Sequence, residues 1–166
     1  YLTGVRLRGA GSRSASVKNH RVGFPNDQRW NGLAEINLNT QYTYLQLAGS
    51  RLARKSGLAI ADARAVQVRI NGRNLASTDP NSPQNGSYVL LEPLNGDWAD
   101  KHFPLDGNGN LFRASIGNHS ANLSKVTSKA QALSLGYSKA SNTSEDDWTP
   151  LFELTAALND TPDETY

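Results

Sequence analysis

Several short stretches of the chain alternate apolar and polar residues, and this period of two predicts strands. Residues 3–9 alternate Val5 and Leu7 with arginines, and residues 17–24 return to an alternating pattern. Residues 9–14 between them are Gly, Ala, Ser and Arg, and they are expected to turn, because glycine reaches positive φ cheaply and serine bonds back to nearby backbone. The chain is therefore predicted to open with a strand, a glycine turn and a second strand.

Two later stretches predict a further pair of strands. Residues 65–70 place three apolar side chains on one face, and residues 87–92 read Ser-Tyr-Val-Leu-Leu-Glu. The polar segment 73–86 separates them, so the pair is expected to form a hairpin with an enlarged loop. Residues 110–113 are a candidate short strand. Residues 95–110 are predicted to be loop around an aromatic turn, and residues 115–144 carry no firm prediction.

A period of three to four residues predicts two helices. Apolar residues recur at that spacing from about 40 to 56, where Gly57 follows as the glycine that ends the helix. Tyr44 lies on the apolar side of this pattern and is expected in the core. Residues 145–159 show the same period, and the preceding Ser144-Glu-Asp-Asp resembles a capping box. The predicted fold class is α+β, with a mostly antiparallel sheet and these two main helices.

Length and composition support one globular domain, since 166 residues at 37% hydrophobic can bury a continuous core. Residues 1–166 are expected to be an excerpt of a longer protein. No apolar run reaches the roughly 18 residues of a membrane span, and any signal segment is expected to lie outside the chain. The absence of cysteine excludes disulfides and thiolate zinc sites.

Charge is divided unequally along the chain. Residues 1–73 hold 12 Lys and Arg against 3 Asp and Glu, whereas residues 74–166 hold 5 against 12. The basic first half suits an anionic partner such as nucleotide phosphate, nucleic acid or an acidic surface. Attraction between the two halves of one fold explains the same pattern equally well.

Familiar catalytic and metal motifs are absent. Ser14 stands where a dinucleotide loop needs its third glycine, and no other standard phosphate loop occurs. Asp106 begins a stretch like a calcium loop, but Leu111 replaces the required glycine. The histidines lack ligand spacing: His20, His102 and His119. Neither a metal site nor a catalytic residue is therefore predicted.

The residues that suit phosphate chemistry surround the first turn. Arg8, Arg13, Lys18 and Arg21 bracket its Gly and Ser residues, so cationic side chains and free backbone N–H groups could converge on one anion. The alternative is a solvated basic face on a hairpin. Glu92 ends an apolar strand, where an unpaired buried carboxylate would be costly, and its partner is expected to be a lysine. Two lysines are candidates: Lys18 and Lys101.

The order of these segments resembles a known family. The stretches 8–13 and 17–22 are similar to the R-G-N-S-S/T and K-K-x-Y-R/K-I/L motifs that open CotH (spore-coat protein H) atypical protein kinases. Later similarities to motifs of that family follow in the same order, at residues 45–58, 65–72, 88–92, 101–103, 109–113 and 148–163. The resemblance spans nearly the whole chain apart from residues 73–86 and 115–144.

The resemblance implies part of an atypical kinase fold, similar to its small lobe, that binds ATP with Mg²⁺ or another divalent cation. It also implies a bacterial protein of the cell surface, spore coat or secreted fraction, whose parent phosphorylates secreted or coat proteins on serine. The implied nucleotide-binding residues are Arg8, Gly9, Gly11, Ser12, Arg13, Lys18, Glu92 and Lys101. Ala10 departs from the family asparagine. The family's catalytic aspartates lie beyond the last helix, so the fragment alone is expected to be inactive.

Two other functions fit the sequence. A non-catalytic surface or coat-assembly module would explain the missing catalytic acids. Nucleic-acid binding through the basic half, with Trp30, Tyr42 and Tyr44 as stacking residues, is the weaker alternative, because Tyr44 is expected in the core.

Overall fold

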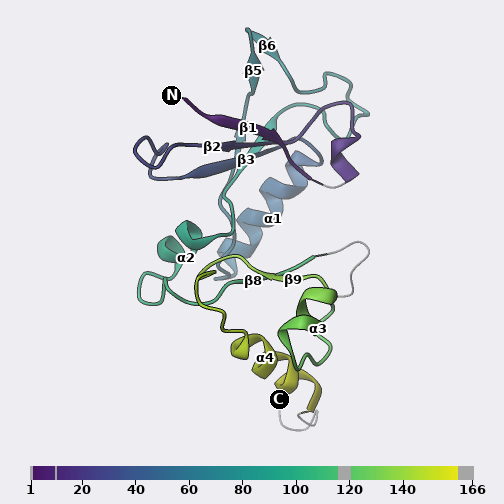
Figure 1. Cartoon of the computed structure of the whole chain (residues 1–166). Helices are drawn as coiled ribbons and strands as arrows, with labels where there is room; N and C mark the ends of the chain where they lie inside the picture. Colours follow the sequence, from purple (N-terminus) through teal and green to yellow (C-terminus); the bar gives the residue numbers. More distant parts are fainter. Residues whose placement is uncertain (1, 10, 116–120, 161–166) are drawn as a thin grey trace. The chain divides into compact units, whose positions relative to one another are not determined.

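The computed structural model describes residues 2–9, 11–115 and 121–160 (Figure 1). The chain divides into two compact units, Tyr1–Trp98 and Ala99–Tyr166. One domain can hold two such units, so the assignment of residues 1–166 to a single domain stays a prediction. No helix among the described residues is both long and apolar enough to cross a membrane.

The first unit is built on a five-stranded sheet in which every neighbouring pair is antiparallel. Its strands, in spatial order, are β1 (Gly4–Leu7), β2 (His20–Gly23), β3 (Glu35–Asn39), β7 (Tyr88–Leu91) and β4 (Ala63–Val66). The predicted first two strands and the predicted pairing of the later two are confirmed. The sequence did not reveal β3, which lies in the middle of the sheet.

The two faces of this sheet differ in polarity. Residues directly opposite each other in antiparallel strands project to the same face. One row on the first face runs from β1 to β4 through Arg6, Arg21, Asn37, Leu91 and Ala63. The matching row on the second face is Leu7, His20, Leu38, Leu90 and Arg64. The first face, which we call the polar face, is thus polar over β1 to β3.

Helix α1 (Thr43–Lys55) confirms the first predicted helix and contacts β4 and β7. It ends in a Schellman motif, in which Gly57 N–H donates to Arg54 and Leu58 N–H donates to Ala53. The placement of Tyr44 in the core was wrong, because its side chain is 65% exposed. The helix instead turns Thr43 and Ser50 inward, and the Ser50 hydroxyl donates to the Ala61 carbonyl at 2.8 Å.

Between β4 and β7 the chain forms a small separate hairpin, β5 (Arg69–Ile70) and β6 (Arg73–Asn74). The predicted strand 65–70 is therefore broken, since residues 67 and 68 belong to neither β4 nor β5. Helix α2 (Gly96–His102) corrects the predicted loop over residues 95–110. It begins there because the Asn95 side chain accepts a hydrogen bond from Trp98 N–H, as an N-cap residue does.

The second unit pairs β8 (Phe112–Ala114) with β9 (Tyr137–Lys139) and adds helices α3 (Lys129–Ser134) and α4 (Thr149–Asp160). The candidate strand at residues 110–113 is confirmed as β8. Its core comprises Val126, Ala132, Tyr137, Trp148 and Leu151. The described residues form four α-helices and mostly antiparallel strands, which is the predicted α+β class.

Helix α4 confirms the second predicted helix, although it begins at Thr149 and not near residue 145. Asp147, and not Ser144, bonds the first turn by accepting from Thr149 N–H at 2.9 Å. Pro150 suits this start, because the first turn of a helix does not need its missing N–H.

Replacing Thr155 by Val is expected to destabilise the second unit. The Thr155 hydroxyl is fully buried, accepts from Val126 N–H at 3.1 Å and donates to the Phe152 carbonyl at 3.2 Å. Valine has nearly the same shape but leaves the Val126 N–H unsatisfied, at a cost of about 1–3 kcal/mol. Urea unfolding measures the loss, and the exposed Thr143→Val serves as control. Equal stabilities of the two variants would contradict this account.

Candidate functional site

The connection between β1 and β2 holds most of the sequence-predicted site. The Arg8 backbone continues the ladder by donating to the Asn19 carbonyl at 2.9 Å, and Gly9 then takes φ +102°. A 3₁₀ turn, η1 (Gly11–Arg13), follows. The Ser12 hydroxyl donates back to the Arg8 carbonyl at 3.4 Å.

Lys18 closes this connection. Its ammonium donates to the Arg13 carbonyl at 2.8 Å, and its own carbonyl accepts from the Tyr88 hydroxyl at 3.1 Å. Burial raises the pKa of Tyr88, which keeps that hydroxyl protonated and able to donate. The β1–β2 connection is thus bonded to Tyr88, the first residue of β7. Six of the predicted site residues lie together in it: Arg8, Gly9, Gly11, Ser12, Arg13 and Lys18.

The polar face beside this connection carries ordered cations. Arg21 forms a two-bond ion pair with Glu35 across β2 and β3, and Asn95 also donates to Glu35 at 3.2 Å. Arg8 donates to the Asn39 side chain at 2.9 Å. Two guanidinium groups are thereby held in fixed positions on one side of the sheet.

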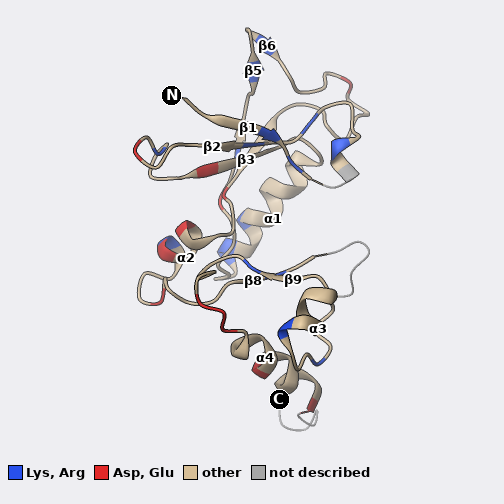
Figure 2. Ribbon diagram, in the orientation of Figure 1, with Lys and Arg blue, Asp and Glu red and all other residues tan. Residues whose placement is uncertain are grey.

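Two further groups on this face lack partners within the described part of the chain. The Arg6 side chain, exposed on β1, forms no hydrogen bond or ion pair there, and it lines a hollow of about 300 Å³ with Arg21 and Glu35. Asn37 is buried, and its side-chain oxygen has no hydrogen-bond partner. Figure 2 shows positive charge along β1 and at η1.

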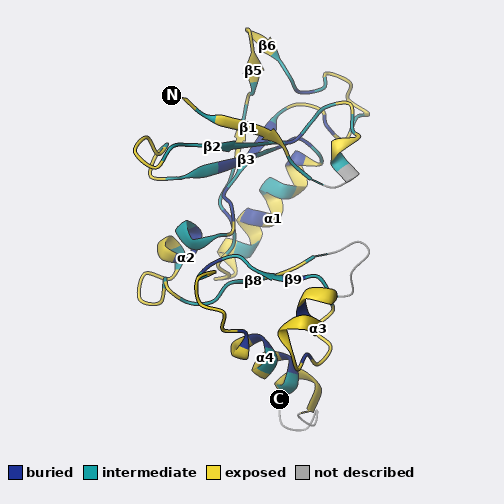
Figure 3. Ribbon diagram, viewed as in Figure 1, coloured by how far each residue is buried: buried dark blue, intermediate teal, exposed yellow. Residues whose placement is uncertain are grey.

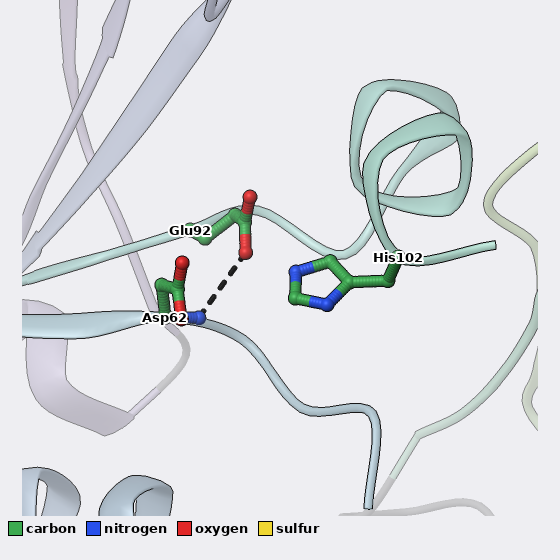
Figure 4. Close-up of side chains that lie close together, drawn as sticks. All are labelled: Asp62, Glu92 and His102. Atoms are coloured by element: carbon green, nitrogen blue, oxygen red, sulfur yellow. Dashed lines mark hydrogen bonds between the residues drawn. The ribbon is translucent and has the colours of Figure 1, made fainter. Parts of the chain in front are cut away.

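Glu92 follows the last residue of β7 and is 4% exposed. Its backbone N–H donates to the Asp62 carbonyl at 3.0 Å, and its carboxylate accepts from Asp62 N–H at 3.1 Å (Figure 4). The Asp62 carboxylate accepts from Arg54 at 2.7 Å. Figure 4 also draws His102, the last residue of α2, which belongs to the second unit.

The two carboxylates offer a place for a divalent cation. One oxygen of Asp62 and one of Glu92 lie within 4.8 Å of each other. Carboxylate oxygens are the ligands that Mg²⁺ prefers, and Mg²⁺ is commonly held by one or two of them together with phosphate oxygens and water. The donor set therefore fits the cation that the sequence resemblance implies.

The structure places Glu92 and Lys18 at opposite ends of β7. Lys18 bonds Tyr88 at the start of the strand, and Glu92 lies four positions after Tyr88, about 13 Å at the usual rise of a strand. Lys101 is exposed on α2 and belongs to the second unit. That one nucleotide contacts all the predicted residues therefore stays a prediction.

Sequence reasoning did not include four residues of the polar face among the site candidates: Arg6, Glu35, Asn37 and Asn39. Three of them share a sequence signal, because Glu35, Asn37 and Asn39 place a polar residue at every second position of one segment. Only the strand register shows that this segment lies beside β2, with β1 on the other side of β2, and that Arg6 and Arg21 face the same way.

Comparison with known proteins defines the class to which this fold and site belong. Residues 5–166 match the family described as CotH kinase protein. Because the match covers nearly the whole chain, the protein belongs to the CotH kinase family, and its function is related to that of these kinases. No curated protein matches the chain.

His20 lies on the second face of the sheet, where its ring is 6.4 Å from the ring of Tyr88. Its buried Nδ1 has no hydrogen-bond partner among the described residues. Burial lowers the pKa of His20 from its ordinary value of 6.5, since the charged imidazolium loses hydration there.

Stability is therefore expected to fall as the pH drops through 6.5. Below that pH the unfolded chain binds a proton at this histidine that the folded chain resists, so protonation favours unfolding until the folded pKa is reached. Thermal unfolding of wild type and His20→Gln between about pH 7.5 and pH 5.5 tests this. The variant should lose this part of the pH dependence, and parallel curves would refute the assignment.

Gly9→Ala is expected to destabilise the β1–β2 connection by about 1–3 kcal/mol. Alanine rarely adopts φ +102°, and its Cβ would lie 1.9 Å from the Ser12 hydroxyl oxygen. Gly4→Ala is the matched control, because a Cβ there meets nothing within 4 Å. Urea unfolding compares the two variants, and equal midpoints would show that the turn tolerates a side chain.

Proposed function

We propose that this chain is the ATP-binding part of a CotH-family protein kinase. The observation that carries the proposal is the meeting of a glycine turn with cations from the two strands that flank it. Arg8, Arg13 and Lys18 lie in the turn connection, and Arg6 and Arg21 lie on the polar face beside it. Backbone N–H groups and guanidinium groups are the usual ligands of phosphate in proteins.

Several groups of this chain would each contact a bound triphosphate. Arg6 has no competing partner among the described residues and is available for a phosphate oxygen. Arg8 and Arg21 are oriented by Asn39 and Glu35, so they would lose little freedom on binding. The glycine turn would lie over the phosphates, as the glycine-rich loop does in protein kinases.

The proposed site differs from that of ordinary protein kinases in one respect. Those enzymes pair a lysine of their third strand with a glutamate of the following helix. Here β3 contains no lysine and α1 contains no acidic residue. The Arg21–Glu35 pair, which lies within the sheet itself, is the ordered cation–carboxylate pair on this face.

Asp62 and Glu92 would hold the divalent cation. A bound Mg²⁺ would neutralise phosphate charge, which is its general role in phosphoryl transfer. By family resemblance the parent protein phosphorylates serine in secreted or coat proteins, and it acts at the surface of a bacterial cell, in a spore coat or outside the cell.

Isothermal titration of the 166-residue chain with MgATP tests the proposal. Wild type should bind, and Arg6→Gln and Lys18→Ala should each weaken binding about tenfold, the effect of losing one charge-assisted bond to phosphate. Arg6→Gln is the cleaner variant, because the Lys18 ammonium also bonds the Arg13 carbonyl.

Arg69→Gln is the charge-matched control, since Arg69 lies on the separate β5–β6 hairpin. It should bind MgATP as wild type does. Absence of binding heat with wild type, or an equal loss in all three variants, would reject a nucleotide site at the β1–β2 connection.

A non-catalytic surface or coat-assembly module is the second candidate, and the exposed apolar side of α1 favours it. Nucleic-acid binding has less support. Tyr42 and Tyr44 are exposed, contrary to the expectation for Tyr44, but Trp30 already stacks on Phe24 with ring centres 6.2 Å apart.

A further inference from the structure

The outward side of α1 carries exposed apolar residues from Tyr44 to Leu52. Tyr44, Leu45 and Leu52 are 65%, 57% and 68% exposed, and Ala48 lies between them on the same side. Figure 3 shows exposed positions recurring along this helix. We call these four residues the outer stripe. Contiguous exposed apolar surface of this kind marks interaction sites more often than isolated apolar residues do.

The helix cannot bury this stripe by rotating on the sheet, because its inner side is fixed by specific bonds. Ser50 donates to the Ala61 carbonyl at 2.8 Å. The Gln46 side chain accepts from Asn39 at 2.9 Å and donates to the Gln41 carbonyl at 2.6 Å. Exposure of the stripe is therefore a consequence of how α1 is held.

A groove lies along one flank of the same helix. This hollow of about 420 Å³ is lined by Leu47, Ser50, Arg51, Arg54, Lys55 and Ala63. Leu47 and Ala63 give it an apolar part, and every other lining residue is polar or charged. The groove thus combines room for an apolar side chain with a cationic rim.

Two cations on this rim are available to a ligand. Arg51 and Lys55 form no hydrogen bond or ion pair with any other residue that the structure describes, whereas Arg54 is paired with Asp62 at 2.7 Å. Arg51 is three residues from Ala48, and Lys55 is three residues from Leu52, so both border the outer stripe. Figure 2 shows this charge at the C-terminal end of α1.

We propose that the groove and the outer stripe dock an acidic amphipathic helix of a partner protein. Apolar residues of the partner, repeated every three to four positions, would cover the stripe. Its carboxylates would bond Arg51 and Lys55. The proposal goes beyond nucleotide binding, since it concerns α1 and not the β1–β2 connection.

Two other occupants match this surface less well. In a symmetric pair of copies, the facing α1 would bring no carboxylate to Arg51 and Lys55, because α1 contains no acidic residue. Nucleic acid would satisfy the cations, but bases stack on rings, and of the outer stripe only Tyr44 offers one. Acidic and apolar groups together on one partner match both features of the surface.

Fluorescence anisotropy of a labelled helical peptide of Leu and Glu, with Leu at spacings of three and four residues, tests this with the full chain. Arg51→Gln combined with Lys55→Gln should weaken binding roughly tenfold, and Leu52→Asp should abolish it. Arg69→Gln combined with Arg73→Gln removes the same charge from the β5–β6 hairpin and should leave binding unchanged.

Peptide controls separate the two contributions. Replacing Glu by Gln should remove the charge-dependent part, and replacing Leu by Ser should remove binding altogether. Circular dichroism confirms that each exposed substitution leaves the fold intact. Equal binding by both double variants would overturn the proposal. A dimer in sedimentation experiments that Leu52→Asp dissociates would also overturn it, by assigning the stripe to a second copy.

Discussion

The first unit depends on β7, a strand with fully buried residues that is paired on both sides. Tyr88 and Val89 are fully buried, and the strand pairs with β3 on one side and β4 on the other. Its Tyr88 hydroxyl also bonds the Lys18 carbonyl, which ties the β1–β2 connection to the core. One strand therefore supports the basic turn at its start and leads to the carboxylate of Glu92 at its end. These buried contacts hold the exposed turn in a fixed position.

The sequence predicted the strands and helices whose apolar residues recur at a regular spacing. The first strands and the helices α1 and α4 repeat their periods over enough residues to be seen in the sequence. Strand β3 was missed because Glu35, Asn37 and Asn39 have the composition of a turn, although their side chains are accommodated by the polar face. Helix α2 has only seven residues within a stretch rich in Gly, Asp and Asn, where Asn95 is its main local signal.

The candidate site also combines residues that are close in the sequence with residues that only the fold brings together. The residues of the glycine turn are neighbours along the chain, so the sequence alone predicts that they lie together. Grouping Arg6 with Arg21 required the register of two strands, and sequence spacing does not contain that register. The orientation of α1 was also beyond local reasoning. On its inner side, Ser50 and Gln46 bond Ala61 and Asn39 of the first unit, while Tyr44 and Leu52 stay exposed.

These inner bonds join α1 to the polar face. Gln46 accepts from Asn39, and Asn39 accepts from Arg8, so a continuous hydrogen-bonded chain runs from the helix to a guanidinium of the proposed nucleotide site. The opposite side of the same helix carries the proposed docking surface. Because Asn39 also positions Arg8, a displacement of α1 along the sheet either breaks the Gln46–Asn39 bond or moves Asn39 and Arg8 with the helix. A partner on α1 could therefore influence nucleotide affinity only by favouring one position of the helix over another, since coupling requires a difference in contacts between two states.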